Sequence, residues 1–501
     1  MLFERPQCPR ELALVAAEEI GEGDDPEPVP ARRVVGKRAE DVKTSHESSG
    51  SHVHSLIVTA ATAKMQLGMQ VNLEDRICAT IADGETELVE LLRALIRFDT
   101  TTHTAGAPAR DEAALQAYLG ERLQAAGASV EISEPDSRLV AGHPMVPDGF
   151  TFDGRPQLVA RFAGAGGGKS LLLNGHVDVV DVQPLDAWSR EPFAAVVAEG
   201  AVHGRGACDM KGGVASMVFA AEVLARLGVR LAGDLIVNTV TEEESTGAGG
   251  LATARTLRAD GAIVTEPTGL DIWVACRGSL LPRITIEGRA GHAGLGRRHP
   301  DDGGAVNAIE KLPIVLDAIR RLREDWSLRP RHPYLSPADI VPTIVQGGEW
   351  IVSHPSSCSL DCHIEYLPDQ ADELGWGSAV EREFTRWIQR AAAADPWLAE
   401  HPPQIEWTAG GVPPAEVSTD DPIVEAALSA VRAVGRPGRL GGLDNWHDGA
   451  TLTVEAGIPA ICLGPGDVYL AHTTSESVPV ADLVACAQAL AVAAVRFCGV
   501  A

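Results

Sequence analysis

The feature that most constrains this sequence is residues 171–178, Leu-Leu-Leu-Asn-Gly-His-Val-Asp, an apolar run that ends in His176 and Asp178. The run follows glycines and has the length of a buried β-strand. Because side chains alternate along a strand, His176 and Asp178 share one face at its end. This pair suits a metal site in which the histidine binds the ion and the carboxylate accepts the second ring N–H. The alternative is that His176 is a structural histidine that binds no metal. The polar residues elsewhere in the chain distinguish these two interpretations.

Apolar runs and amphipathic segments alternate on both sides of residues 277–410. Strands are predicted at residues 129–133, 157–162, 171–176, 234–240, 262–264 and 459–464, and helices at residues 86–97, 111–126, 214–227, 422–434 and 480–498. This alternation is typical of an α/β protein whose mostly parallel sheet is covered on both faces. We therefore expect a catalytic domain in two parts, residues 85–276 and 411–501.

Between these parts the order of elements changes. Strands are predicted at residues 284–288, 343–345, 359–366 and 404–407, and helices at residues 305–323 and 379–394. The resulting β-α-β-β-α-β order is that of a ferredoxin-like module. Residues 277–410 are thus predicted to be an inserted domain, whereas residues 1–70 show no lasting hydrophobic period and are expected to be a disordered extension.

Polar side chains gather where the predicted strands end, which is where sites lie in open α/β sheets. They are His176, Asp178, Asp209, Glu243, Glu244, Glu266 and His472. Five carboxylates in one cleft repel one another, and divalent cations are the usual compensation. Histidine with aspartate and glutamate suits zinc, and one carboxylate can bridge two such ions. No C-x-x-C, H-E-x-x-H or G-x-S-x-G motif offers a competing chemistry.

Some segments of the sequence resemble other motifs, and some of the candidate site residues allow a structural interpretation. Residues 164–170 resemble a phosphate-binding loop, but Ala163 stands where the first glycine is needed and a strand follows, so a hairpin turn is favoured. Residues 247–252 fit G-x-G-x-x-A after an acidic run that would repel a pyrophosphate. Residues 242–244 could be a solvated acidic loop, Asp209 a helix cap, and His292 an ordinary loop histidine.

Composition excludes several kinds of partner. A formal charge of −27 and a pI near 4.9 argue against nucleic acid and against an anionic membrane surface. Nine cysteines without a C-x-x-C pair indicate reduced thiols, and no signal peptide or charge-free transmembrane stretch is recognised. A cytoplasmic protein is therefore expected.

The order of these motifs resembles the M20 metallopeptidase and amidohydrolase family, which includes acetylornithine deacetylase, succinyl-diaminopimelate desuccinylase, aminoacylase and glutamate carboxypeptidase. The resemblance covers residues 85–501 and rests on five motifs in sequence. They are His176-Val-Asp178, residues 204–213 around Asp209, the triplet 242–244, Glu266, and residues 471–476 around His472. It implies a zinc-binding α/β domain interrupted by a ferredoxin-like lid that forms a homodimer.

The resemblance also implies a role for each residue. His176 and Glu266 would bind one zinc, Glu244 and His472 the other, and Asp209 would bridge both, with cobalt a possible substitute. Asp178 would support His176, and Glu242 replaces the usual aspartate of the triplet. Glu243 would be the general base of amide hydrolysis, and His292 would reach a neighbouring subunit's site and stabilise the oxyanion.

One position departs from the family pattern. Many members have an arginine in a lid strand that grips a substrate carboxylate, and here Glu365 stands at that position. The candidates to replace it are Arg277, Arg283, Arg297 and Arg298. The expected function is a deacylase of a small N-acyl amine or N-acyl amino acid. The alternatives are a dipeptidase or carboxypeptidase of the same family and a catalytically inactive metal-binding scaffold.

Overall fold

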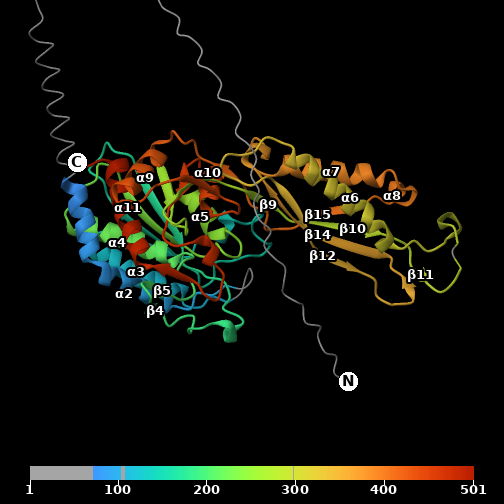
Figure 1. Ribbon diagram of the computed structural model, residues 1–501, viewed down its shortest axis with the longest axis horizontal. Helices are drawn as coiled ribbons and strands as arrows, with labels where there is room; N and C mark the ends of the chain where they lie inside the picture. Colours follow the sequence, from blue (N-terminus) through green and yellow to red (C-terminus); the bar gives the residue numbers. More distant parts are fainter. Residues whose placement is uncertain (1–71, 103–107, 297) are drawn as a thin grey trace, which may run out of the picture. The chain divides into compact units, whose positions relative to one another are not determined.

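The computed structural model describes residues 72–102, 108–296 and 298–501 (Figure 1). The extension expected at residues 1–70 and Arg297 lie outside the described residues. The described chain starts with a helix at residues 72–83, followed by α2 (Glu85–Ile96) and α3 (Glu112–Ala125). The apolar side chains of α2 face the core, and its charged residues face solvent, as the helical spacing predicts.

A nine-stranded mixed sheet forms the centre of the molecule. Its order is β1-β2-β6-β3-β7-β18-β8-β16, with β17 also paired to β8. The strands are β1 (Ser129–Ser133), β2 (Gln157–Phe162), β3 (Leu171–His176), β6 (Leu235–Val240), β7 (Gly261–Val264), β8 (Ile272–Cys276), β16 (Ala415–Glu416), β17 (Leu440–Leu443) and β18 (Ala460–Cys462). The middle strands β6, β3, β7 and β18 run parallel, so their carboxyl ends lie at one edge. This confirms the predicted α/β class.

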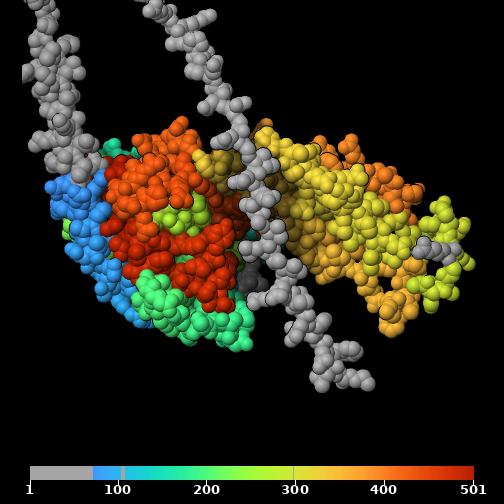
Figure 2. All heavy atoms as spheres, viewed as in Figure 1, coloured from blue at the N-terminus to red at the C-terminus, as the bar shows by residue number. Residues whose placement is uncertain are grey.

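Helices cover this sheet on both faces, because every residue of β3, β6 and β7 is buried. The helices that pack together on it are α4 (Lys211–Arg226), α9 (Pro422–Ala433) and α11 (Val480–Cys498), joined by α2 and α3. A second group is α5 (Ala248–Thr256) with α10 (Asp448–Ala456). Figure 2 shows red C-terminal atoms lying against the blue atoms of the first described helices, so the two ends of the described chain build one body.

Helix α11 is the one described helix that is long and apolar enough to cross a membrane. Most of its residues are buried, and it packs against α4, α9 and α2. Its apolar composition is therefore accounted for by its place in the core.

The inserted segment forms a separate antiparallel sheet in the order β12-β14-β10-β15, with β9 beside β14. Its strands are β9 (Gly278–Leu280), β10 (Pro282–Glu287), β12 (Asp339–Gly347), β14 (Ser357–Tyr366) and β15 (Gln404–Trp407). Helices α6 (Ala308–Ser327) and α7 (Ser378–Ala392) lie side by side against it (Figure 1). The order β10-α6-β12-β14-α7-β15 confirms the ferredoxin-like module, and we call it the lid.

The hairpin predicted at residues 164–170 is wrong, because β6 lies between β2 and β3. The segment instead runs along the end of the sheet, where Gly168 approaches the Cys498 carbonyl so closely that a Cβ would lie 2.0 Å from its oxygen. The glycines therefore allow backbones to touch.

Candidate metal centre

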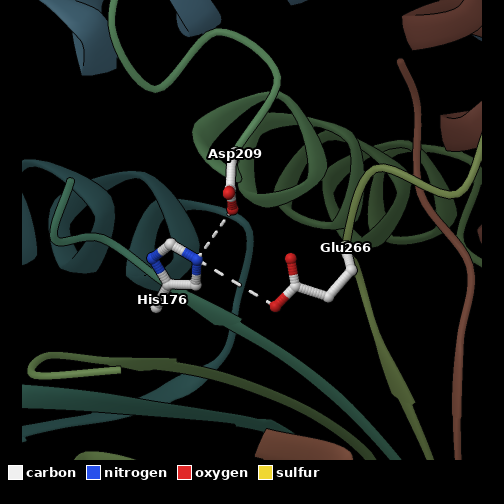
Figure 3. A group of neighbouring side chains, drawn as sticks. All are labelled: His176, Asp209 and Glu266. Carbon is white, nitrogen blue, oxygen red and sulfur yellow. Dashed lines mark hydrogen bonds and ion pairs between the residues drawn. The ribbon is translucent and has the colours of Figure 1, made fainter. Parts of the chain in front are cut away.

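His176 is the last residue of β3 and is 1% exposed. Its Nε2 lies 3.1 Å from Asp209 Oδ1 and 4.0 Å from Glu266 Oε1 (Figure 3). Asp209 precedes α4, and Glu266 follows β7, the strand parallel to β3. The ligand atoms of these three residues lie within 4.8 Å of one another, which is close enough for them to hold one cation.

A second group shares Asp209 with the first. His472 Nε2 lies 3.2 Å from Asp209 Oδ2 and 3.1 Å from Glu244 Oε1. Asp209 thus turns one oxygen to each histidine, and the ligand atoms of Asp209, Glu244 and His472 also lie within 4.8 Å of one another. The first group is largely buried, whereas the His472 side chain is 53% exposed. Two neighbouring cation sites therefore meet at Asp209, one inside and one at the entrance.

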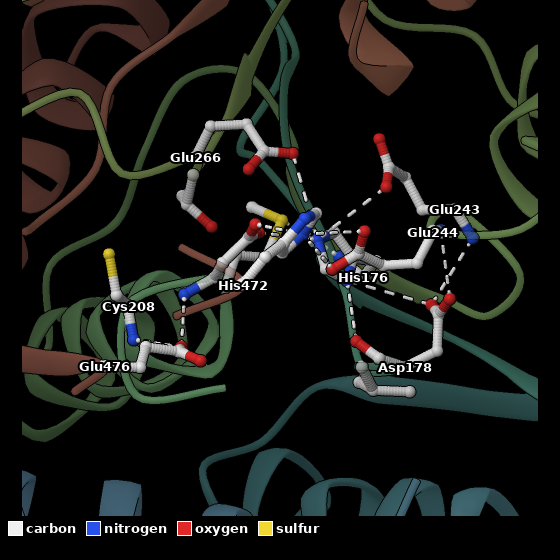
Figure 4. Close-up of polar contacts among 12 residues, drawn as sticks. His176, Asp178, Cys208, Glu243, Glu244, Glu266, His472 and Glu476 are labelled. Carbon is white, nitrogen blue, oxygen red and sulfur yellow. Dashed lines mark hydrogen bonds and ion pairs between the residues drawn. The ribbon is translucent and has the colours of Figure 1, made fainter. Parts of the chain in front are cut away.

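Asp178 contacts these residues differently from the prediction. The second nitrogen of His176, Nδ1, lies 2.9 Å from the backbone carbonyl oxygen of Asp178, whereas the nearer carboxylate oxygen is 3.7 Å away. The carboxylate instead accepts the backbone N–H groups of Glu243, at 3.3 Å, and Glu244, at 3.1 Å (Figure 4). One residue thus orients the histidine through its main chain and holds the acidic triplet through its side chain.

The triplet sits on a tight turn after β6. Glu242 has φ 67°, in the left-handed region, and its carbonyl accepts the N–H groups of Thr246 and Gly247. Its carboxylate is 2.6 Å from Arg155 Nε and also accepts the Ser245 hydroxyl, and both charged side chains are buried. Glu242 is therefore an anchor of the turn. Arg155 was not predicted, because nothing near it in the sequence marks it.

Glu476 is a second residue whose role was not predicted, although it lies in the motif at residues 471–476. It is 1% exposed and accepts the backbone N–H groups of Cys208 and Asp209 at 3.0 and 3.1 Å (Figure 4). Arg205 pairs with Glu476 at 2.5 Å and donates to the carbonyl of Thr473 at 3.3 Å. This pair ties the loop that carries Asp209 to the loop that carries His472.

The acids of this centre are held in an unfavourable environment. Burial raises the pKa of Glu243 and of Glu266 well above the usual range, and neighbouring carboxylates raise both further. Burial, with the charge of Asp209, raises the pKa of Glu244 to about 7. Hydrogen bonds to Asp209 and Glu244 raise the pKa of His472 to about 10. The protein thus gathers more negative charge than its own histidines balance.

A further buried carboxylate lies beside this centre. Asp448 begins α10, is 1% exposed, and neither of its side-chain oxygens has a hydrogen-bond partner. Burial raises the pKa of Asp448 to about 7. Its charge is among the causes that raise the pKa of Glu243 and Glu266. Sequence reasoning missed Asp448, since it follows a loop rather than an apolar strand.

The donor set fits divalent cations. Each group offers one imidazole nitrogen and carboxylate oxygens, the ligands that zinc takes in hydrolases. Cations at these positions would also relieve the repulsion among the carboxylates. Within the described residues, the predicted ligands His176, Asp209, Glu244, Glu266 and His472 are brought together.

His292 is the predicted site residue that the structure does not bring to this centre. It lies on β11 (Gly291–His292), which pairs with β13 (Ser353–His354) in the lid, and its side chain is exposed. Its Nδ1 accepts the N–H of Gly294 at 3.0 Å. A role for His292 at the site of the same chain gains no support from the described contacts.

The structure describes three of the four arginines that could bind a substrate carboxylate. Arg277 pairs with Glu365, and Arg283 binds Asp361 through two contacts of 2.6 and 2.7 Å. Arg298 is exposed.

Fold and site together define a metal-binding hydrolase of the α/β class. The model of the peptidase family M20/M25/M40 matches residues 172–496, so the chain belongs to this family, whose members hydrolyse amide bonds.

Two of the relatives that match most of the chain illustrate the similarity. An N-formyl-4-amino-5-aminomethyl-2-methylpyrimidine deformylase from Bacillus subtilis is 27% identical over 422 residues, covering 81% of this chain and 93% of the relative. An acetylornithine deacetylase from Myxococcus xanthus is 29% identical over 430 residues, covering 84% and 100%. Both names describe removal of an acyl group from nitrogen.

The fold is also that of a solved structure, the aminopeptidase PepT from Bacillus cereus. The TM-score is 0.61 at 20% sequence identity, covering 82% of this chain and 98% of that one. At this identity the likeness supports the fold.

Proposed function

We propose that this protein is a dinuclear zinc deacylase that hydrolyses the amide bond of a small N-acyl amine, with cobalt as a possible substitute metal. The observation that carries the proposal is Asp209, which offers one oxygen to each of two ligand groups. Two cations held this way lie close together, as in two-metal hydrolases. The two relatives described above are named as a deformylase and a deacetylase, which supports a deacylase over a peptidase.

The ligands divide between the two positions. His176 and Glu266 would hold the inner cation, Glu244 and His472 the outer one, and Asp209 both. When bound, zinc supplies Lewis acidity, which makes a water easier to deprotonate and an amide carbonyl easier to attack. Asp178 and Glu476 fix the loops that carry these ligands by accepting their backbone N–H groups.

Glu243 is the remaining acid of the centre, and we assign it the role of proton carrier. Its carboxylate oxygen Oε2 lies 3.9 Å from His176 Nε2, and Glu243 is absent from both ligand groups. Burial raises the pKa of Glu243, and a buried carboxylate with a raised pKa is a stronger base than one in water. Glu243 would take a proton from the attacking water and deliver it to the departing amine nitrogen.

We further propose that the protein works as a homodimer through the lid in a reducing, cytoplasmic compartment. The partner's lid would then supply His292, whose exposed position in its own chain suits a contact made elsewhere. The eight cysteines of the described residues are free thiols.

Glu243→Gln tests the proposed mechanism. The variant should keep both metal ions and lose activity by about 10²–10⁴-fold, the usual contribution of a general base. Metal content by elemental analysis and kcat with N-acetyl, N-formyl and N-succinyl amines are the two readouts. Glu425→Gln, an exposed glutamate on α9, is the matched control.

Full activity in Glu243→Gln would refute the assignment of the base. Unchanged metal stoichiometry in His472→Ala, which should lose about one ion per chain, would refute the outer ligand group. Preference for substrates with a free amino terminus would favour a dipeptidase instead.

A further inference from the structure

The chain passes from the central sheet to the lid at Arg277, between β8 and β9. Arg277 is 8% exposed, and each of its guanidinium nitrogens has a partner. Nε and Nη2 donate to the Asp444 carbonyl at 3.1 and 2.7 Å, and Nη1 donates to the Pro337 carbonyl at 3.1 Å. Nη2 also forms an ion pair with Glu365 of β14. Its positive charge is therefore paired with Glu365, and every guanidinium nitrogen has an acceptor.

The loop that Arg277 holds leads to the metal centre. Asp444 lies after β17, and four residues later Asp448 starts α10. Asp448 packs so closely on α5 that a Cβ on Gly250 would lie 2.0 Å from its Oδ1. A Cβ on Gly247, which follows the acidic triplet, would lie 2.7 Å from the Trp446 side chain, so the loop between Asp444 and Asp448 packs against the turn that carries the triplet.

The other buried cations of the described residues are committed in the same way. Arg155 pairs with Glu242, and Arg205 pairs with Glu476. Lys211 is fully buried and donates to the Phe98 carbonyl at 2.9 Å. Arg155, Arg205, Lys211 and Arg277 are the buried arginines and lysines among these residues. None of the four charges is left to bind a substrate anion.

We propose that the substrate is an N-acyl amine without a carboxylate and that Glu365 sets this preference by neutralising Arg277. The inference rests on the proposed deacylase function and names its substrate class. A carboxylate beside Arg277 would lose hydration without gaining a charged partner and would face Glu365, whereas a neutral or cationic amine would not. The two relatives differ in this respect, because acetylornithine carries a carboxylate and a formylated aminopyrimidine carries none.

The test compares amides that differ only in a carboxylate. N-formylbenzylamine is paired with N-formylphenylglycine, and N-acetylbutylamine with N-acetylnorvaline. The zinc-loaded enzyme should show at least about a tenfold higher kcat/KM for the member without the carboxylate, equivalent to about 1.4 kcal/mol. Glu365→Gln removes the closer of the two carboxylates beside Arg277, since Asp444 Oδ1 lies 3.7 Å from Nε, and should shift this ratio towards the carboxylate by about tenfold, chiefly through KM.

Asp361→Asn is the matched control. It removes an acid from the same strand, β14, but the ion-pair partner of Asp361 is the exposed Arg283. It should leave the ratio unchanged. Equal or better turnover of the carboxylated members by the unmodified enzyme would overturn the substrate class. A ratio that does not move in Glu365→Gln, or moves equally in Asp361→Asn, would overturn the role of Glu365.

Binding separates this inference from the proposed function. Dissociation constants of the same pairs are measured calorimetrically with metal-loaded Glu243→Gln. If no amide is turned over by the unmodified enzyme but the carboxylate-free members bind more tightly, the proposed function fails and the substrate class is supported. If the carboxylated members bind equally or better, the substrate class fails whatever is turned over.

Discussion

At the scale of single residues, Glu242 shows how the centre depends on side chains outside it. A non-glycine residue in the left-handed region stores backbone strain of order 1–3 kcal/mol, and it persists where the surroundings over-determine it. Here the ion pair with Arg155 and the hydrogen bond from the Ser245 hydroxyl fix Glu242. The next two residues, Glu243 and Glu244, thereby face the metal centre. Arg155 is therefore a positioning residue.

Arg155→Met should leave Glu242 buried and unpaired, at a cost of about 3–5 kcal/mol in the free energy of unfolding. We expect a lower Tm and a lower kcat with KM little changed. Arg155→Met combined with Glu242→Met should recover stability, since a hydrophobic pair tolerates the site, but not kcat. Arg155→Lys should restore part of kcat.

Recovery of kcat by the double variant would show that the ion pair stabilises the fold without placing Glu243 and Glu244. A stability loss in Arg155→Met no larger than that of an exposed arginine variant would show that the pair is not buried in solution.

Sequence reasoning reached His176, Glu244 and Glu266 because they lie at or soon after the ends of apolar strands, and Asp209 because it precedes a helix. His472 lies in a loop, and its role, like the division of the ligands between two ions, was implied by the resemblance to the M20 family. Arg155, Glu476 and Asp448 could not be reached in this way. Their partners are distant in the sequence, and a buried ion pair leaves no periodic pattern. The hydrogen bond of His176 was misassigned for a related reason, because spacing does not decide between a carbonyl and a carboxylate two residues away.

At the scale of elements, α10 couples the lid boundary to the metal centre. Its N-cap is His447, whose Nδ1 accepts the N–H of Gly449 at 3.0 Å. An acceptor at Nδ1 requires that nitrogen to be unprotonated. Burial lowers the pKa of His447 to about 4, so the cap persists at neutral pH. The boundaries of the predicted helices and strands agree with the structure to within a few residues, and the predicted range 480–498 matches α11 because its apolar run is uninterrupted, whereas α10 was not predicted.

His447 should make stability depend on pH. Between its ordinary pKa near 6.5 and about 4, the unfolded chain binds a proton that the folded chain does not. The free energy of unfolding should therefore fall with decreasing pH by up to ~1.4 kcal/mol per unit across this window. His447→Asn keeps a capping oxygen and cannot titrate, so its urea-unfolding curves should lack this part of the slope.

The readout is the difference in slope between the two proteins, so other titrating groups cancel. Parallel pH profiles from pH 7 to 4 would contradict a buried neutral imidazole. His299→Asn is the control, because His299 also caps a short helix but is exposed.

At the scale of the whole molecule, the lid leaves one sheet edge open. Strand β12 pairs with β14 on one side only within the described residues, and it exposes Val341, Ile344 and Val345 at 43, 50 and 54%. An exposed apolar edge strand favours pairing with another chain. A second copy pairing here in antiparallel fashion would bury both edges, which agrees with the proposed homodimer.

Val345→Lys should convert the dimer to a monomer, because each interface would gain two buried charges, and light scattering after size exclusion would show it. Val197→Lys, a similarly exposed valine on β4 (Val196–Ala198), should stay dimeric.

If His292 acts across the dimer, mixing inactive His292→Ala with inactive Glu243→Gln should restore about a quarter of the activity. A monomeric unmodified protein, or no recovery on mixing, would refute this arrangement.

The two histidines of the centre come from opposite sides of the lid insertion. His176 precedes the lid in the chain and His472 follows it, and both meet at Asp209. Two metal ions held there would act as a crosslink that closes a loop containing the whole lid. Like a disulfide, such a link gains its effect by restricting the unfolded chain, and long loops gain most. The same carboxylate that organises the chemistry would then add metal binding to the packing that holds the two parts of the catalytic domain together.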